Sequence, residues 1–171
     1  MHRLVSSVVL FALAACSPTL DWRELRPAGS GAQLMFPCKP SSQTRPLELA
    51  GVRVPLTLHA CSAGGATYAL AVADVGDVSH IAAALIQLGD AATRNLAGDA
   101  QALPLPHVAG ATPQPQARRL LVRGHLPDGS ATQQQLIVFS RGTRIYQASV
   151  LGASLDGEGV ETFLGSIRLS D

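Results

Sequence analysis

Three strand-length segments separated by two tight turns restrict the C-terminal half of the chain to an antiparallel arrangement. Short apolar runs lie within 118–126, 132–140 and 144–151. Pro-Asp-Gly at 127–129 and Arg-Gly at 141–142 supply the turns between them. Short apolar runs bounded by turn residues are typical of strands, and short turns join neighbouring strands antiparallel. These residues predict a three-stranded meander.

The N-terminal half contains a second set of strand signals. Residues 34–36 form a short apolar run, and residues 52–60 and 67–74 alternate on either side of a Ser-Ala-Gly-Gly turn at 62–65. This pattern predicts one short strand followed by an antiparallel hairpin. Pro55 lies inside the first hairpin strand, which favours an edge position because proline cannot donate to the ladder.

Two helices are expected, one long and one short. Residues 78–96 place apolar side chains three and four apart, the stripe of an amphipathic helix, and Gly98 is the expected stop. Residues 157–165 predict the short helix, and residues 166–169 a closing strand or coil. Residues 99–116 hold four of the eleven prolines and read as a surface loop, with an extended piece at 107–109.

The resulting order of elements predicts an α+β domain, with an antiparallel sheet of about six strands and two helices packed on it. A chain of 171 residues that is 47% hydrophobic supports one such domain. We assign it to residues 32–171. Residues 16–31 read as a tether because proline and glycine punctuate them, although Leu20 and Trp22 are apolar enough to dock on the domain.

Several short motifs resemble those of the PsbP-like family. They are Phe36-Pro37, the Tyr-x-Leu-x-Val of Tyr68, Leu70 and Val72, the long helix, Arg-Ile-Tyr at 144–146, and the Phe-Leu-x-Ser of Phe163, Leu164 and Ser166. The resemblance spans about residues 33–170. It implies an α/β/α sandwich, and members of the family mainly bind other proteins or act as assembly factors. No binding residue of the family can be carried onto a position of this chain.

The first fifteen residues have the organisation of an export signal. A short positive start that contains Arg3 precedes an apolar run over residues 4–15, and Ser17-Pro18 ends it. A membrane-spanning helix needs roughly twenty apolar residues, so this run is too short to remain as a span. Residues 1–15 are therefore predicted to be a cleaved signal peptide.

The junction Leu13-Ala14-Ala15-Cys16 resembles the lipobox of bacterial lipoproteins. The resemblance implies that Cys16 becomes the mature N-terminus and carries two or three acyl chains, which anchor the protein in a lipid bilayer. More than one chain makes membrane residence stable. Serine at position 17 implies onward transport to the outer membrane rather than retention in the inner membrane, with the domain facing the periplasm. Ordinary secretion is the alternative.

Charge argues against a nucleic-acid partner. The formal net charge is +1, the basic residues are scattered, and loss of Arg3 with a leader lowers the total to about zero. Proteins that bind nucleic acid present a basic surface instead.

Cys38 and Cys61 are predicted to form a disulfide. They lie just after the first predicted strand and at the end of the second, and an oxidising periplasm permits the bond. The alternatives are free buried thiols, or a copper or zinc site that adds His59 from the same strand face. No CxxC or HxxxH spacing supports a metal site, and we expect no metal and no cofactor.

No catalytic motif is present in the sequence. GxSxG and SxxK do not occur, and the acidic residues near 156–161 are explained by the start of a helix, where negative charge is favourable. We therefore expect a protein that is not an enzyme.

Alternation predicts one polar sheet face that could bind an anionic or peptide ligand, with an ordinary solvated face as the alternative. Its predicted members are Arg53, Thr57, His59, Arg123, His125, Gln133, Gln135, Gln147 and Ser149. Val54, Leu56, Leu120, Val122 and Val150 are assigned to the opposite face.

The sequence thus predicts a periplasmic lipoprotein that serves as a protein-binding or assembly accessory of the cell envelope. A small-molecule or metal-binding module that uses the polar face around His59 is the alternative function.

Overall fold

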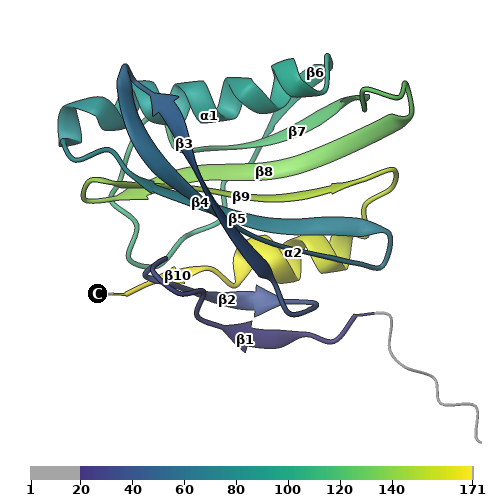
Figure 1. Cartoon of the computed structure of the whole chain (residues 1–171). Coiled ribbons are helices and arrows are strands. Elements are labelled where there is room, and N and C mark those ends of the chain that lie inside the picture. Colours follow the sequence, from purple (N-terminus) through teal and green to yellow (C-terminus); the bar gives the residue numbers. More distant parts are fainter. Residues whose placement is uncertain (1–19, 171) are drawn as a thin grey trace, which may run out of the picture.

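A seven-stranded antiparallel sheet forms the centre of the structure, a computed structural model that describes residues 20–170 (Figure 1). The strand order is β3-β4-β5-β9-β8-β7-β6. These strands are β3 (Ser41–Leu49), β4 (Val52–Ala63), β5 (Ala66–Asp74), β6 (Asp99–Leu103), β7 (Arg118–His125), β8 (Ala131–Arg141) and β9 (Arg144–Gly152). The predicted hairpin and meander are confirmed, and the fold is α+β.

The expectation of about six strands was too low. The large sheet gains β3 and β6 at its two edges, and β2 (Ala32–Phe36) leaves it to form a second sheet with β1 (Arg23–Leu25) and β10 (Arg168–Leu169). Nearly every residue of β3 and β6 is exposed. Edge strands like these bury no face, so their sequences carry no alternation to detect.

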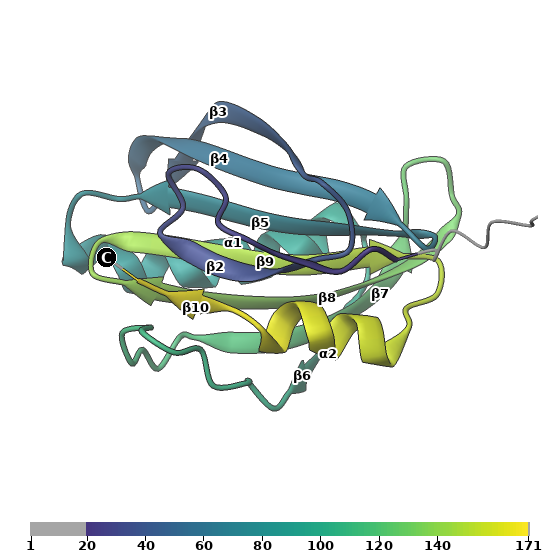
Figure 2. The same cartoon turned by 90° about the horizontal axis from the view of Figure 1, so that it is seen from below.

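The two faces of the large sheet are covered differently. Helix α1 (Ile81–Asn95) lies on one face, while α2 (Gly157–Gly165) and the small sheet lie on the other (Figures 1 and 2). Each face has its own apolar core. Because both faces are buried at the centre, several central strands are apolar on both sides.

Helix α1 ends where two glycines bring its C-terminus against β7. The helix follows a single 3-10 turn, η1 (Val78–His80), and is capped by Leu96 rather than Gly98. The backbone N–H of His125 donates to the carbonyl oxygen of Leu96 at 2.9 Å. A β-carbon at Gly98 would lie 2.1 Å from the carbonyl oxygen of Arg123, and one at Gly124 would lie 2.2 Å from that of Leu96. Only glycine permits this approach.

Strand β4 is not an edge strand, contrary to the expectation from Pro55, because it lies between β3 and β5. Pro55 stands opposite Pro46 of β3, and the pairing of β4 with β5 begins one residue later, at Leu56. Proline has no backbone N–H to donate, but Pro55 lies outside the β4–β5 ladder, so no hydrogen bond to β5 is lost.

Part of the predicted tether is folded onto the domain. Residues 23–25 form β1, which pairs antiparallel with β2. The ring of Trp22 packs edge-on against Tyr68, with centroids 5.7 Å apart. The predicted signal peptide and Cys16 lie outside the described residues. Over residues 20–170, no helix is both long and apolar enough to cross a membrane.

Candidate functional site

Most members of the predicted polar face share the α2 side of the sheet, as predicted, but they do not form one open surface. The register of β5, β8 and β9 places Gln147 and Ser149 on the α1 side of the sheet, whereas His59 projects to the α2 side. Val150, which was assigned to the opposite face, lies on the α2 side with His59. The assignment failed for β9 because this strand is buried on both faces, so its sequence does not show which face is polar.

The α2 side of the sheet is also not an open surface. At its centre, α2 and the small sheet cover it and enclose one of the two cores. Arg53 is exposed near the β3–β4 turn, opposite Glu48. Arg123 and His125 line a separate hollow of about 360 Å³ at the far end of β7 and β8. The predicted face is therefore divided among distant places.

His59 is a buried residue with one unpartnered nitrogen. It is 2% exposed, and the hydroxyl of Ser42 lies 2.7 Å from its Nδ1. Its Nε2 is buried and has no hydrogen-bond partner within the part of the chain that is described. Burial lowers the pKa of His59, because the charged imidazolium would lose its hydration. Burial therefore favours the neutral form of this side chain.

The cavity beside His59 is small and polar. It measures about 190 Å³, and its walls include Asp74 of β5 and Arg144 of β9, which stand opposite each other in the ladder. Hydrogen bonding from the backbone N–H of Gly76 holds the pKa of Asp74 below its usual range. This cavity is smaller than the usual size of a ligand site.

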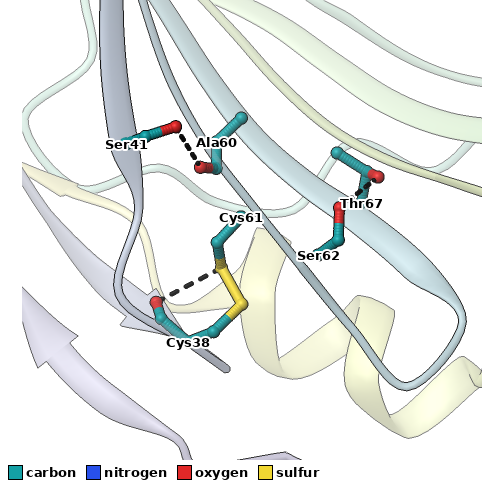
Figure 3. The surroundings of a disulfide bond; sticks show 6 residues. All are labelled: Cys38, Ser41, Ala60, Cys61, Ser62 and Thr67. Carbon is teal, nitrogen blue, oxygen red and sulfur yellow. Dashed lines mark hydrogen bonds between the residues drawn. A yellow bond between two sulfur atoms is a disulfide. The ribbon is translucent and has the colours of Figure 1, made fainter.

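The disulfide removes both cysteine thiolates from the alternative metal site that would have included His59. Cys38 and Cys61 are bonded, with their Cα atoms 6.0 Å apart, and the Sγ of Cys61 lies 3.2 Å from the carbonyl oxygen of Cys38 (Figure 3). The predicted disulfide is confirmed, and a bonded sulfur cannot serve as a thiolate ligand. Within residues 20–170, no group of three His, Cys, Asp or Glu side chains is placed to hold a metal ion.

A largely apolar hollow lies between α1 and the β3–β4–β5 part of the sheet, and we call it the helix cleft. Its volume is about 410 Å³. It is lined by Leu47, Leu49, Leu56, Leu58, Ala71, Gln87, Leu88, Ala91, Ala92, Arg94, Asn95, Gln134 and Gln147. Gln147 is the one residue of the predicted binding face found here.

The cleft exists because one helix cannot cover a wide sheet. Helix α1 packs mainly on β7, β8 and β9, and it touches the sheet only lightly at β3. A helix is about 10–12 Å wide with its side chains. Seven strands about 4.8 Å apart span roughly 29 Å. The uncovered leucines remain partly open to solvent, with Leu47 39% and Leu58 38% exposed.

The two ends of the cleft differ in polarity. The leucines of β3 and β4 form one end together with Leu88 of α1. At the other end lie Arg94 and Asn95, from the last turn of α1, and Gln134 of β8. Arg94 is the single ionisable side chain that lines the cleft.

Gln87 fixes the distance between the helix and the β3–β4 turn. Its side-chain amide donates to the carbonyl oxygen of Glu48 at 2.8 Å and accepts from the backbone N–H of Ala50 at 2.9 Å. Both hydrogen-bonding functions of the amide are therefore used to hold the wall of the cleft. The cleft is a preformed feature of the fold.

Sequence reasoning missed this cleft, although a signal for it existed. Val54 and Leu56 of β4 were assigned to the apolar face of the sheet. A single long helix set against six or more strands leaves part of such a face uncovered, and that mismatch could have been noticed. The identity of the uncovered strands could not, because β3 was not predicted.

A second hollow of about 470 Å³ lies under the proline-rich segment that follows β6. Leu105, His107 and Phe139 are among its walls. One side of it is formed by an irregular loop instead of a helix. We therefore take the helix cleft as the candidate site.

Comparison with known proteins adds no family. No family model matches the chain, and no curated protein matches it. Among solved structures, the crystal structure of a protein from Bacteroides thetaiotaomicron VPI-5482 is similar, with 10% sequence identity and a TM-score of 0.42. The alignment covers 88% of this chain, which spans 42% of that protein. A likeness at this level carries no conclusion about function.

Proposed function

We propose that the protein is a non-enzymatic binding module of the bacterial cell envelope, which holds a small and largely apolar ligand in the helix cleft. The observation that carries this proposal is the pair of partly exposed leucines, Leu47 and Leu58, facing a cleft of ligand size between helix and sheet. Ligand pockets typically measure about 300–1,000 Å³ and are mostly apolar.

The energetics favour an apolar occupant. Fully burying a leucine side chain yields about 1.5–3 kcal/mol, and an occupant would complete the burial of both leucines. The walls need no rearrangement, because Gln87 already joins α1 to the β3–β4 turn. A preformed site avoids the cost of ordering its walls on binding.

The lining of the cleft supports binding without catalysis. Arg94 is its single ionisable residue, and its other polar groups are the amides of glutamine and asparagine. Neither a carboxylate nor an imidazole lines the cleft, so these walls offer no group with a pKa suited to general acid or base catalysis near neutral pH.

We also propose that Cys16 carries the lipid anchor and that the domain faces the periplasm, at the outer membrane rather than the inner one. The support is the Leu-Ala-Ala-Cys junction after a short apolar run. The six residues that follow Cys16 reach Trp22, which is docked on the domain. Six residues can extend at most about 20 Å, so this anchor would hold the domain close to the bilayer.

The anchor is tested by the intact mass of the protein from native membranes, compared with a Cys16→Ala variant. We expect a diacylglycerol-sized mass on the native protein that is absent from the variant, together with release of the variant from sedimented membranes. An unmodified cysteine in the native protein would contradict the anchor.

The cleft is tested with a neutral apolar dye, N-phenyl-1-naphthylamine, and the full chain carrying Cys16→Ser to remove acylation. We expect the dye to bind, and Leu58→Asn to weaken binding about tenfold, because an amide replaces apolar contact area. Leu126→Asn is the matched control, since Leu126 is 37% exposed and lies outside the cleft. Absence of dye binding, or equal effects of the two variants, would contradict the site.

A protein partner is the second candidate function, and strand β3 favours it. This nine-residue edge strand pairs with β4 alone, and its residues 41–48 are exposed. Such an edge can accept a strand from another protein, although Pro46 interrupts the row of donors. Photo-crosslinking from Thr44 in living cells tests it: one defined envelope protein captured there supports the proposal, and no adduct contradicts it.

The finer assignment of the fold to PsbP-like domains is likewise a proposal. Its support is that residues of the resembling motifs meet in one core. The ring of Phe163 packs edge-on against Phe36 at 5.1 Å and against Tyr68 at 5.4 Å. These contacts join β2, β5 and α2.

A further inference from the structure

We propose that the ligand of the helix cleft is a single-chain amphiphile with a carboxylate head, its tail between Leu47 and Leu58 and its head at Arg94. This inference rests on the proposed function of the cleft as a ligand site. It adds the chemical class of the ligand and the direction in which the ligand lies.

The shape of the cleft fits an elongated molecule. Its floor crosses five neighbouring strands, from Leu47 of β3 through Leu58 and Ala71 to Gln147 of β9 and Gln134 of β8. The last two turns of α1 form the wall along the same path. A volume of about 410 Å³ is near the lower end of the usual range for ligand pockets, which suits one chain and not two.

The polarity of the residues that line this path determines the orientation of the ligand in the cleft. The end at β3 and β4 offers leucine side chains and the amide of Gln87, which is engaged by backbone groups. Gln43 and Arg45 share this side of β3, but they hydrogen-bond to each other and do not line the cleft. An alkyl tail at this end would meet no unsatisfied polar side chain. Polar groups of the ligand belong at the opposite end, beside Asn95 and Gln134.

The positive charge of Arg94 indicates which head group the ligand carries. Arg94 lines the cleft, is exposed, and forms no side-chain hydrogen bond or ion pair within the described part of the chain. The acid one turn before it, Asp90, is bound by the guanidinium of Arg118 at 2.8 Å. Glu48 accompanies Thr44 on the side of β3 that faces away from the cleft, by the alternation of the strand. Neither of these two carboxylates therefore competes with a ligand for Arg94.

An arginine with free N–H groups favours a carboxylate partner. The guanidinium presents paired donors that match the two oxygens of a carboxylate, and such charge-assisted hydrogen bonds are stronger than neutral ones. The neutral amides of Asn95 and Gln134 can donate to the same head without adding charge.

The test compares dodecanoate with dodecanol, below their aggregation concentrations, by isothermal titration calorimetry on the full chain carrying Cys16→Ser. The two probes share a tail and differ in the charge of the head. We expect dodecanoate to bind about tenfold more tightly than dodecanol. Arg94→Gln should remove this difference by weakening dodecanoate alone, and Leu58→Asn should weaken both probes.

Two variants serve as controls. Arg53→Gln removes an exposed arginine outside the cleft, and Leu126→Asn changes an exposed leucine outside it, so neither should alter the affinity for dodecanoate. Because Arg94 is exposed, its replacement should leave the thermal midpoint unchanged, which separates a lost contact from a lost fold.

Contrary outcomes are distinguishable. If dodecanol binds as tightly as dodecanoate, or if Arg94→Gln weakens both probes equally, the carboxylate assignment is overturned while the cleft remains a site. If the neutral dye binds and neither dodecyl probe does, the single-chain ligand is overturned. If the dye also fails to bind, the proposed function itself is overturned.

Discussion

The side-chain amide of Gln87 in α1 donates a hydrogen bond to the carbonyl oxygen of Glu48 in β3, across the edge of the helix cleft. The same amide accepts from the N–H of Ala50, so one side chain ties the helix to the end of β3 and to the first residue of the turn that follows it. Replacing Gln87 with leucine should lower the free energy of unfolding by about 1 kcal/mol, since a partly buried backbone donor and an exposed backbone acceptor lose their partner.

The measurement is urea denaturation of the Gln87→Leu protein. Gln43→Leu is a suitable control, because Gln43 is exposed and its one side-chain hydrogen bond is with Arg45 of the same strand. An unchanged urea midpoint for Gln87→Leu would contradict the bridging role. A reduced affinity for the apolar dye in this variant would further indicate that the bridge maintains the shape of the cleft.

Gly124→Ala should be destabilising by about 1–3 kcal/mol, because the new β-carbon would overlap the carbonyl oxygen of Leu96. Gly165→Ala is the contrasting variant: nothing lies within 4 Å of its added β-carbon, and it sits at the end of α2. Alanine is the better helix former, so this change should be neutral or stabilising. Thermal denaturation of the two variants tests this prediction. Equal midpoints for Gly124→Ala and Gly165→Ala would show that the close approach of α1 to β7 is not rigid.

The stability of the domain should fall as the pH is lowered through the usual pKa of histidine, near 6.5, because of His59. Its pKa is lowered by burial in the folded state, so the unfolded chain binds this proton at a higher pH than the folded chain does. Stability from this residue is complete above about pH 6.5 and decreases as the pH falls toward the folded-state pKa.

Unfolding free energies measured between pH 5 and 8 test this linkage. His59→Gln should flatten the dependence, whereas His125→Gln, at an exposed position, should leave it in place. The lowered pKa of Asp74 does not interfere, because its contribution is lost only as the pH falls below the usual carboxyl value near 3.8. If the unfolding free energy of His59→Gln still falls with decreasing pH as in the native protein, the pH dependence comes from another group.

Opening the disulfide should cost about 3 kcal/mol of stability, because Cys38 and Cys61 are 23 residues apart and the bond restricts the unfolded chain. Urea midpoints with and without reductant measure the loss, and Cys38→Ser with Cys61→Ser should reproduce it. Cys16→Ser should leave the reductant-sensitive shift intact. If reductant does not change the urea midpoint of the native protein, the disulfide does not contribute this stability.

Local patterns in the sequence predicted most of the fold. The meander, the hairpin and both helices appear close to their predicted positions, since alternation and helical spacing are properties of neighbouring residues. The pairing of Cys38 with Cys61 followed from their places next to predicted strands.

Strand β3 could not be predicted from local sequence patterns. All of its residues except Leu49 are exposed, and what makes them a strand is pairing with β4, a contact between separate segments. The face on which Gln147 lies was also undetermined, because a strand buried on both sides alternates between two apolar environments.

By itself, then, the sequence determined the identity of the central elements, the disulfide partners and the apolar character of Leu56 and Leu58. Only the tertiary structure decided that Leu58 and Leu47 stay partly open beside α1. The physical reason is one of dimensions. A single helix covers about a third of the width of a seven-stranded sheet, and which strands it leaves bare depends on where the helix ends and how the β3–β4 hairpin is held.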